Sequence, residues 1–234
     1  DSTNIIQPEL SIITNISYDH VHLLGNTLEK IAFEKAGIIK PDVPVVIGEF
    51  ANESVKAVFT KTSKSNNSKL VEAEKISLKP YICPLLGHYQ QRNMFTLLAS
   101  IKPLRNKGFK IDNKSVFRGI KNVITNTGLR GRWEIISKNP YIICDVAHNP
   151  AGIKYVIKQI KKTQHKILHF VIGVVNDKDI SEILKLLPKK NAVYYFTQAK
   201  IPRALDSKKL KIVANNMGLS GESYPTTRMA LKAA

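Results

Sequence analysis

Short apolar runs alternate with amphipathic segments along this chain of 234 residues. Residues 10–16 are apolar and rich in β-branched side chains, residues 27–37 repeat apolar residues at helical spacing, and residues 44–48 are apolar again. A short apolar run bounded by turn residues is typical of a buried strand. A strand, a helix and a second strand in this order favour a parallel sheet covered by helices. The sequence therefore predicts an α/β fold.

Other signals locate the ends of the expected elements in the first half of the chain. Thr27 can cap the first helix, and Gly37 can end it. The polar, Lys-rich residues 60–69 are expected to form an exposed loop or hairpin tip. Helices are expected over residues 89–104 and 113–122. The first of these two should bury an apolar face made of Met94, Leu97, Leu98 and Ile101.

The apolar periodicity stops near residues 126–128 and then starts again, so we place a domain boundary near residues 128–131. Beyond it, strands alternate with helices in the manner of a Rossmann-like unit. The expected strands are residues 133–137, 141–145, 167–174 and 192–197, and the expected helices are residues 151–161, 180–187 and 207–217. We therefore expect two domains, residues 1–128 and residues 129–234.

The net charge of +18 is of a size found in nucleic-acid-binding proteins. Residues 1–60 carry four Lys and eight Asp or Glu, so the positive charge lies in the rest of the chain. Most of it is Lys, and it is spread over the expected helices rather than gathered in one stretch. A solvated Lys-rich surface accounts for this distribution. We therefore expect no nucleic-acid partner.

The cysteines and the apolar runs bear on where the protein works. Cys83 and Cys144 suit neither a disulfide framework nor a zinc site. A reducing, cytoplasmic location is therefore expected. No apolar run approaches the roughly 18 residues of a membrane-spanning helix, so we expect no membrane partner. The sequence begins with Asp and ends within an expected helix, which indicates a piece of a longer protein.

In the first half, polar residues follow the expected elements at places where α/β folds bind ligands. Asp19 and His20 follow the first strand, either as a polar turn or with the imidazole as a metal ligand. Lys35, at the end of the first helix, is either a partner of the helix dipole or a desolvated amine that forms a carbamate with carbon dioxide. Gln90 and Asn93 share one face of a helix start, where amides either cap the helix or bind a purine edge.

The second half offers three further candidates. Arg132 has a guanidinium suited to phosphate oxygens, although a surface Arg is the ordinary case. Asp145 and His148 lie between a strand and a helix, where α/β folds bind nucleotides and where capping residues also occur. No Gly-rich phosphate loop is present anywhere in the sequence. A complete ATP site is therefore not expected in these 234 residues.

Seven stretches match the motifs of one family in wording and order. They are residues 1–4, 13–16, 19–20, 24–38, 87–93, 131–132 and 145–150. Together they resemble the dihydrofolate synthase and folylpolyglutamate synthase family of the Mur ligase superfamily, most closely at Glu34-Lys35-Ala36-Gly37. One departure is Tyr89, which stands where this family often has His. The family's phosphate loop, its magnesium-binding Glu and the end of its carboxy-terminal domain have no counterpart in the sequence.

The resemblance implies an α/β, Mur-ligase-like fold. Residues 1–128 would be part of an amino-terminal P-loop ATPase-type domain, and residues 129–234 a smaller, truncated Rossmann-like domain. The implied activity uses ATP and Mg²⁺ to join L-glutamate to dihydropteroate or to a reduced folate through an acyl phosphate. The implied partners are these small molecules, and the protein is expected to be a monomer. Without the phosphate loop, the isolated chain is expected to be inactive.

The family's pattern also implies roles for residues in the first domain. His20 would be a magnesium ligand, and Lys35 would carry the carbamate that supports a second metal. Asp1 and Ser2 match positions that contact the pterin substrate.

Four further roles are implied around the nucleotide. Asn93 would contact adenine, Arg132 the phosphates, and Asp145 the nucleotide from the second domain. His148 would lie near the glutamate and the phosphate. Metal ions and Arg132 together would neutralise the charge on the transferred phosphoryl group.

Three alternatives stay open. A Mur-type ligase that adds an amino acid to a cell-wall nucleotide precursor belongs to the same superfamily, although residues 1–4 and 34–37 favour folate. A basic nucleic-acid-binding protein would show binding that weakens steeply with salt. A catalytically inactive scaffold is the third alternative.

Overall fold

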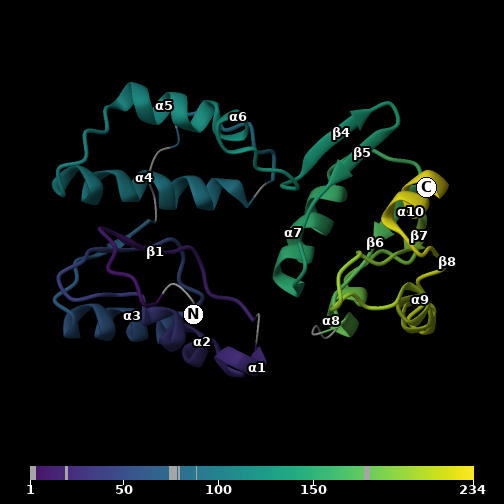
Figure 1. Cartoon of the computed structure of the whole chain (residues 1–234), viewed down its shortest axis with the longest axis horizontal. Coiled ribbons are helices and arrows are strands. Elements are labelled where there is room, and N and C mark those ends of the chain that lie inside the picture. The colour runs from purple at the N-terminus through teal and green to yellow at the C-terminus, as the bar shows by residue number, and fades with distance from the viewer. Residues whose placement is uncertain (1–3, 19–20, 74–77, 79, 88, 177–179) are drawn as a thin grey trace. The chain divides into compact units, whose positions relative to one another are not determined.

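The structure is a computed structural model that describes residues 4–18, 21–73, 78, 80–87, 89–176 and 180–234. The chain divides into two compact units, residues 1–146 and residues 147–234 (Figure 1). Within those described ranges, no helix combines the length and the apolar character that crossing a membrane requires.

The first unit is built around a parallel sheet of three short strands in the order β1-β2-β3. The strands are β1 (Ser11–Ile13), β2 (Val45–Ile47) and β3 (Leu70–Glu72). Ser11 pairs with Val45, which in turn pairs with Leu70. The strands expected within residues 10–16 and 44–48 are confirmed over shorter spans.

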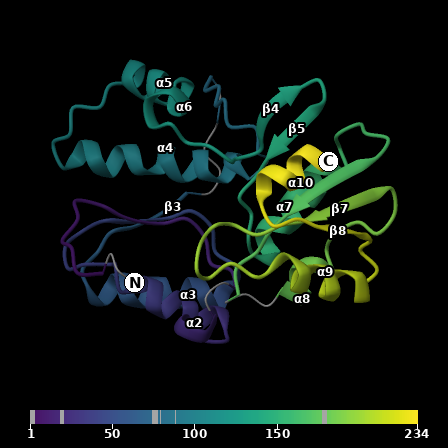
Figure 2. The ribbon, with the colours of Figure 1, turned by 45° about the vertical axis from the view of Figure 1, so that its right-hand side comes forward.

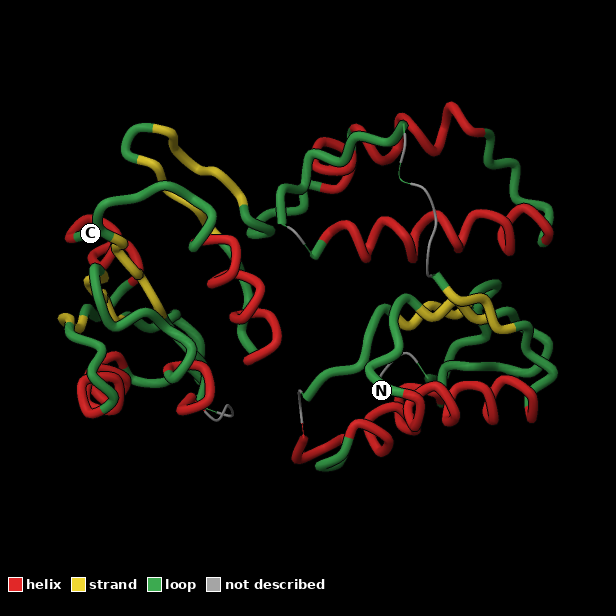
Figure 3. The backbone as a smooth tube through the Cα atoms, turned by 180° about the vertical axis from the view of Figure 1, so that it is seen from behind, coloured by secondary structure: helices red, strands yellow, loops and turns green. Residues whose placement is uncertain are grey.

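Helices cover both faces of this sheet. α2 (Leu28–Ala36) and α3 (Glu53–Ser65) pack on one face, and α4 (Gln90–Asn106) packs on the other (Figure 3). All three residues of β2 are at most 1% exposed. Burial on both faces explains why this strand is a continuous run of β-branched apolar residues.

The first helices begin and end where the sequence indicates. The short α1 (Val21–Leu24) precedes α2. The Thr27 hydroxyl accepts a hydrogen bond from the backbone N–H of Lys30 at 3.2 Å, and the Gly37 N–H donates to the carbonyl of Glu34. The expectation of a helix capped by Thr27 and ended by Gly37 is confirmed.

The expectation of an exposed loop over residues 60–69 is wrong for the first half of that stretch, where α3 continues. The Asn52 side chain caps the start of α3 by accepting the N–H of Val55 at 2.8 Å. Val55, Phe59 and Ser63 are buried at four-residue spacing. One buried helical stripe and a good cap outweigh the polar character of the last turns.

α4 is packed on two sides, which changes the face that the sequence predicts to be buried. Met94 belongs to a core cluster shared with α5 (Asn113–Lys121), and Ala99 to a cluster shared with the sheet. Leu97 lies on neither packed side and is 40% exposed, so the expectation that it is buried is wrong. α6 (Val123–Thr127) follows α5.

An antiparallel hairpin of β4 (Glu134–Lys138) and β5 (Tyr141–Cys144) closes the first unit. Both strands lie where the sequence predicts them. Asp145 directly follows β5, and the hairpin brings it back beside the turn at residues 131–133. The N–H of the next residue, Val146, donates to the carbonyl of Gly131 at 3.0 Å.

The second unit is built around another parallel sheet, in the order β6-β7-β8. Its strands are β6 (Leu168–Ile172), β7 (Ala192–Phe196) and β8 (Gly221–Ser223). Its helices are α7 (Pro150–Ile160), α8 (Ile180–Leu184), α9 (Ser207–Asn216) and α10 (Thr227–Ala233). Figure 2 shows α8 and α9 on one side of β7 and β8, with α10 on the other. The alternation expected for a Rossmann-like unit is confirmed, whereas β8 is not anticipated from the sequence.

Stacked aromatic rings make up the centre of the second unit. The rings of Tyr194 and Phe196 lie 5.8 Å apart, and both side chains are at most 1% exposed. Leu184 of α8 and Leu210 of α9 complete the same cluster. Each unit therefore has a hydrophobic core of its own.

Candidate functional site

The carboxylate of Asp145 joins three segments of the first unit. Its Oδ2 atom accepts the backbone N–H of Trp133 at 2.8 Å and the hydroxyl of Tyr89 at 3.2 Å. Arg132 lies close enough for its charge to act on the Tyr89 hydroxyl. The structure thus brings together two residues singled out from the sequence, Asp145 and Arg132, with two that were not.

The turn that presents the Trp133 N–H has unusual backbone geometry. Gly131 has φ 69° and Trp133 has φ 51°, both in the left-handed region. A Cβ atom on Gly131 would lie 2.6 Å from Cγ1 of Val146, so no larger residue fits without a shift. The Gly131 N–H donates to Glu134 Oε2 at 2.7 Å, and this bond is the main cause of a lowered pKa for the Glu134 carboxyl.

The Tyr89 hydroxyl remains a hydrogen-bond donor over a wide pH range. Burial raises the pKa of Tyr89 to about 12, and the charge of Asp145 and the hydrogen bond to it add to the shift. The nearby Arg132 acts in the opposite direction. The Tyr89 phenol is therefore protonated and donates its hydrogen bond to the Asp145 carboxylate.

The first turn of α4 carries the pair of amides expected from the sequence. The Asn93 amide donates to Gln90 Oε1 at 2.8 Å, and the Gln90 side chain is 7% exposed. The residue at the cap position is Tyr89, and its side chain makes no capping hydrogen bond. The two amides instead fix each other's orientation.

A cavity of about 580 Å³ opens beside this turn. Its wall is mostly apolar and includes Tyr81, Leu86 and Met94, with Gln90 as a polar member. This volume lies within the range of small-molecule pockets. A flat ring with a polar edge would suit a cavity of this composition.

Lys35 lies in the last turn of α2 and is half-buried. Among the residues that the structure describes, its amine has no hydrogen-bond or ion-pair partner. Close by in the sequence, the Lys40 amine donates to the side-chain oxygen of Asn4 at 2.7 Å, to the Asn4 carbonyl and to the carbonyl of Gly37 at 3.0 Å. Lys40 thereby fixes the start of the described chain against the end of α2.

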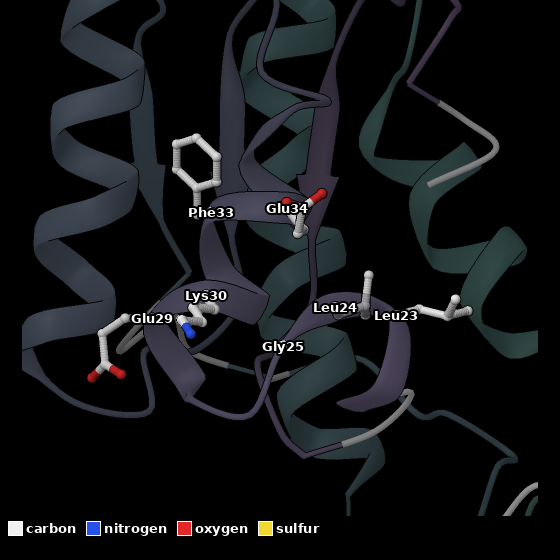
Figure 4. A pocket seen from close by; sticks show the side chains of 7 residues that line it. All are labelled: Leu23, Leu24, Gly25, Glu29, Lys30, Phe33 and Glu34. Atoms are coloured by element: carbon white, nitrogen blue, oxygen red, sulfur yellow. The ribbon is translucent and has the colours of Figure 1, made fainter.

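A second cavity, of about 410 Å³, lies beside α1 and α2 (Figure 4). It is lined by Leu23, Leu24, Gly25, Glu29, Lys30, Phe33 and Glu34. Phe33 is 67% exposed. Lys35 does not line this cavity, which the sequence does not predict.

His148 lies exposed in the loop between β5 and α7. The neighbouring Asn149 caps α7 by accepting the Gly152 N–H at 2.8 Å. Three other candidates, Asp1, Ser2 and His20, fall outside the described residues, so their expected roles stay predictions.

Magnesium in proteins is held by oxygen ligands, often carboxylates. No group of three or more His, Cys, Asp or Glu side chains in that part of the chain could hold a metal ion. A lysine amine becomes an oxygen ligand only after carboxylation, so Lys35 as it stands does not change this result. The described residues therefore contain no preformed cluster of this kind, and a magnesium ion would also need ligands from outside it, such as phosphate oxygens of a substrate.

Sequence reasoning missed Tyr89, Trp133 and Lys40. Tyr89 falls inside a recognised motif but stands out only as a departure from the usual His. Trp133 acts through its backbone N–H, which no side-chain pattern reveals. Lys40 acts on a segment 36 residues away in the sequence.

Comparison with known proteins gives a family match for the second half of the chain and relatives for all of it. The family model described as "Mur ligase, glutamate ligase domain" matches residues 131–234. Folylpolyglutamate synthase from Lacticaseibacillus casei is 29% identical over 228 residues, which cover 88% of this chain and 52% of the relative. The chain therefore spans about half the length of this relative.

Solved structures agree with the sequence matches. FolC from Escherichia coli, in complex with DHPP and ADP, aligns with a TM-score of 0.82 and 26% identity over 100% of this chain and 57% of its own. Folylpolyglutamate synthase from Mycobacterium tuberculosis, complexed with ADP and AMPPCP, aligns with a TM-score of 0.83 and 29% identity over 100% of this chain and 58% of its own. The fold is therefore α/β and Mur-ligase-like.

Proposed function

Because this chain belongs to the folylpolyglutamate and dihydrofolate synthase family of the Mur ligase superfamily, we propose that its activity is ATP-dependent ligation of L-glutamate to a pterin-containing acid. The acceptor is dihydropteroate, a folate that already carries glutamate, or both. The main observation behind this proposal is how Asp145 is held. Its carboxylate accepts hydrogen bonds from Trp133 and Tyr89, and Arg132 lies nearby. This arrangement supports a preformed nucleotide contact at the carboxyl end of a strand.

The proposed reaction has two steps. First, an oxygen of the acceptor carboxylate attacks the γ-phosphorus of ATP, and ADP leaves. Second, the amine of glutamate attacks the carbonyl carbon of the acyl phosphate, inorganic phosphate leaves, and the amine loses a proton. Both steps build negative charge on phosphoryl oxygens, which fixed positive groups stabilise.

In this proposal, each described residue has a limited task. Asp145 accepts hydrogen bonds from the ribose, and Asn93, held by its hydrogen bond to Gln90, contacts the adenine edge. Arg132 binds phosphate oxygens, for which its planar guanidinium is suited. His148, exposed in its loop, acts near the glutamate and the leaving phosphate.

The acceptor and metal sites complete the proposal. Asp1 and Ser2 contact the pterin, and His20 is a magnesium ligand. Lys35, carried as a carbamate, provides an oxygen ligand of the kind that magnesium prefers. Magnesium, when bound, would neutralise charge on the phosphates.

Ligase activity is not proposed for the 234 residues alone, because their sequence contains no Gly-rich phosphate loop. Activity is therefore best tested on the gene product as the cell makes it. Turnover by the isolated chain would contradict this part of the proposal.

Product identification tests the proposal against its rival. The gene product is incubated with ATP, Mg²⁺ and L-glutamate, and with dihydropteroate, a reduced folate or a nucleotide-linked cell-wall precursor, and the products are analysed by mass spectrometry. Glutamylated pterin is the expected product. An amino-acid adduct of the cell-wall precursor alone would favour the other Mur-type ligase, and no product with any acceptor would favour an inactive scaffold.

A further inference from the structure

Tyr89 occupies the position before α4 where a capping side chain is usual, but it does not cap the helix. Its backbone has φ −68° and ψ −16°, and its side chain makes no capping hydrogen bond. The hydroxyl instead donates to Asp145, 56 residues later in the sequence. The side chain therefore links the start of α4 to a distant carboxylate instead of capping the helix.

The ring of Tyr89 lies over Gly87, which leaves room for it. A Cβ atom at Gly87 would stand 2.6 Å from Cε1 of the Tyr89 ring. A larger residue at position 87 would therefore push the ring away from its place. The sequence Gly87-His88-Tyr89 in this way combines a small residue with the aromatic side chain that packs over it.

The partner carboxylate is held at a strained turn. Trp133 has a left-handed backbone with φ 51°, a conformation that is unfavourable for a non-glycine residue. Its side chain is only 5% exposed, and its N–H donates to the same Asp145 oxygen that Tyr89 contacts. Strain of this kind is retained where surrounding contacts over-determine the geometry, often at functional sites.

We propose that Tyr89 is a positioning residue for nucleotide binding, which fixes Asp145 relative to the first turn of α4. Asn93 lies one helical turn after Tyr89, so one turn carries both the proposed adenine contact and the hydroxyl that holds the proposed ribose contact. The ligand is an adenosine nucleotide whose base and sugar are bound by groups set at a fixed spacing. This inference rests on the proposed function.

The chemical nature of Tyr89 gives the inference a distinctive test. Among the described residues, Asp145 and Arg132 are charged groups that act on its hydroxyl. A phenol with a pKa of about 12 donates at every pH of an ordinary assay. An imidazole at this position would change its charge near pH 6.5. Below that pH it would donate to Asp145 as a cation, and above it only one tautomer would donate.

The experiment measures the Kd for ADP on the natural gene product by titration calorimetry. Tyr89→Phe removes the donor and keeps the ring, so the Kd should rise about 3- to 10-fold, which corresponds to loss of one typical hydrogen bond. The KM for ATP should rise by a similar factor, while kcat and the KM for the acceptor stay within about twofold. Tyr89→His should restore binding near pH 6 and lose affinity as the pH rises to about 8.

The matched control is Tyr141→Phe, because Tyr141 is exposed on β5 four residues before Asp145. It should bind ADP as the wild type does. Tyr89→Phe with an unchanged Kd, or Tyr89→His with an affinity that does not depend on pH, would overturn the inference alone. Failure of the wild type to bind ADP would overturn the proposed function and the inference with it.

Discussion

The carboxylate of Asp145 and the amine of Lys35 both belong to the proposed chemistry, but their surroundings differ. Asp145 accepts hydrogen bonds from Tyr89 and Trp133, which come from two other segments of the first unit. The half-buried amine of Lys35 has no such partner among the residues that the structure describes. The fold itself therefore orients the Asp145 carboxylate, which is the proposed nucleotide contact. For Lys35, in contrast, the described residues show no such orientation of the amine, which in our proposal carries the carbamate.

The largest expected effect is the loss of ligase activity when Lys35 is replaced. Lys35→Arg keeps the positive charge but cannot form a carbamate, so kcat of the natural gene product should fall by about 10²- to 10³-fold. Its free energy of unfolding should change by no more than about 0.5 kcal/mol, because Lys35 makes no hydrogen bond or ion pair with a described residue and Arg keeps the aliphatic stem. Steady-state kinetics and urea denaturation measure the two quantities.

Lys30→Arg is the matched control, since Lys30 lies earlier on the same helix and has no proposed role in the reaction. It should retain the wild-type kcat. Wild-type turnover by Lys35→Arg would remove the carbamate from the proposal.

For stability the order is reversed: replacing Asp145 should cost more free energy of unfolding than replacing Lys35. Asp145→Ala leaves the Tyr89 hydroxyl and the Trp133 N–H without their shared acceptor, so the free energy of unfolding should fall by about 1–3 kcal/mol. Asp145→Asn keeps an acceptor and should lose less. Urea denaturation without any ligand provides the measurement. An Ala variant as stable as the wild type would show that the carboxylate is not held in the way described.

Gly131 tests whether the turn around Asp145 is tightly packed. Gly131→Ala adds a Cβ atom 2.6 Å from the Val146 side chain at φ 69°. Gly128→Ala is the control, because Gly128 has a similar φ of 65° and no atom within 4 Å of the added Cβ. The control should lose about 1 kcal/mol and Gly131→Ala clearly more, as measured by thermal unfolding. Equal losses would contradict tight packing at the turn.

The smallest effect concerns the anchor near Lys35. Lys40→Met removes the three hydrogen bonds to Asn4 and Gly37. Because Asn4 and Lys40 are partly solvated, the loss of stability should stay below about 1 kcal/mol. Amide hydrogen exchange should nevertheless speed up over residues 4–9 and stay unchanged in α4. Unchanged exchange over residues 4–9 would show that Lys40 does not fix this segment.

The sequence predicts the repeating strands and helices well, because buried strands and amphipathic helices leave clear periodic patterns. It fails at residues 60–65, where polar residues hide the end of a helix whose buried stripe starts earlier, at Val55. It also fails at Leu97, because packing on two sides of α4 cannot be read from one helical face.

The sequence likewise predicts only part of the candidate site. Asp145 and Arg132 are found because their side chains occupy recognised motifs. The hydrogen bonds that hold Asp145 are missed, because they depend on a backbone N–H at Trp133 and on a residue 56 positions away. Local patterns give the residue types of a site, whereas long-range pairing has to come from the fold.

The most direct test of the central claim is phosphate release by the natural gene product supplied with ATP and Mg²⁺. L-glutamate and a pterin acceptor, dihydropteroate or tetrahydrofolate, are added separately and together. Phosphate release is expected only when both glutamate and one of the two acceptors are present. Phosphate release that proceeds equally without glutamate or without either acceptor, or no release under any of these conditions, would contradict the proposed ligase activity.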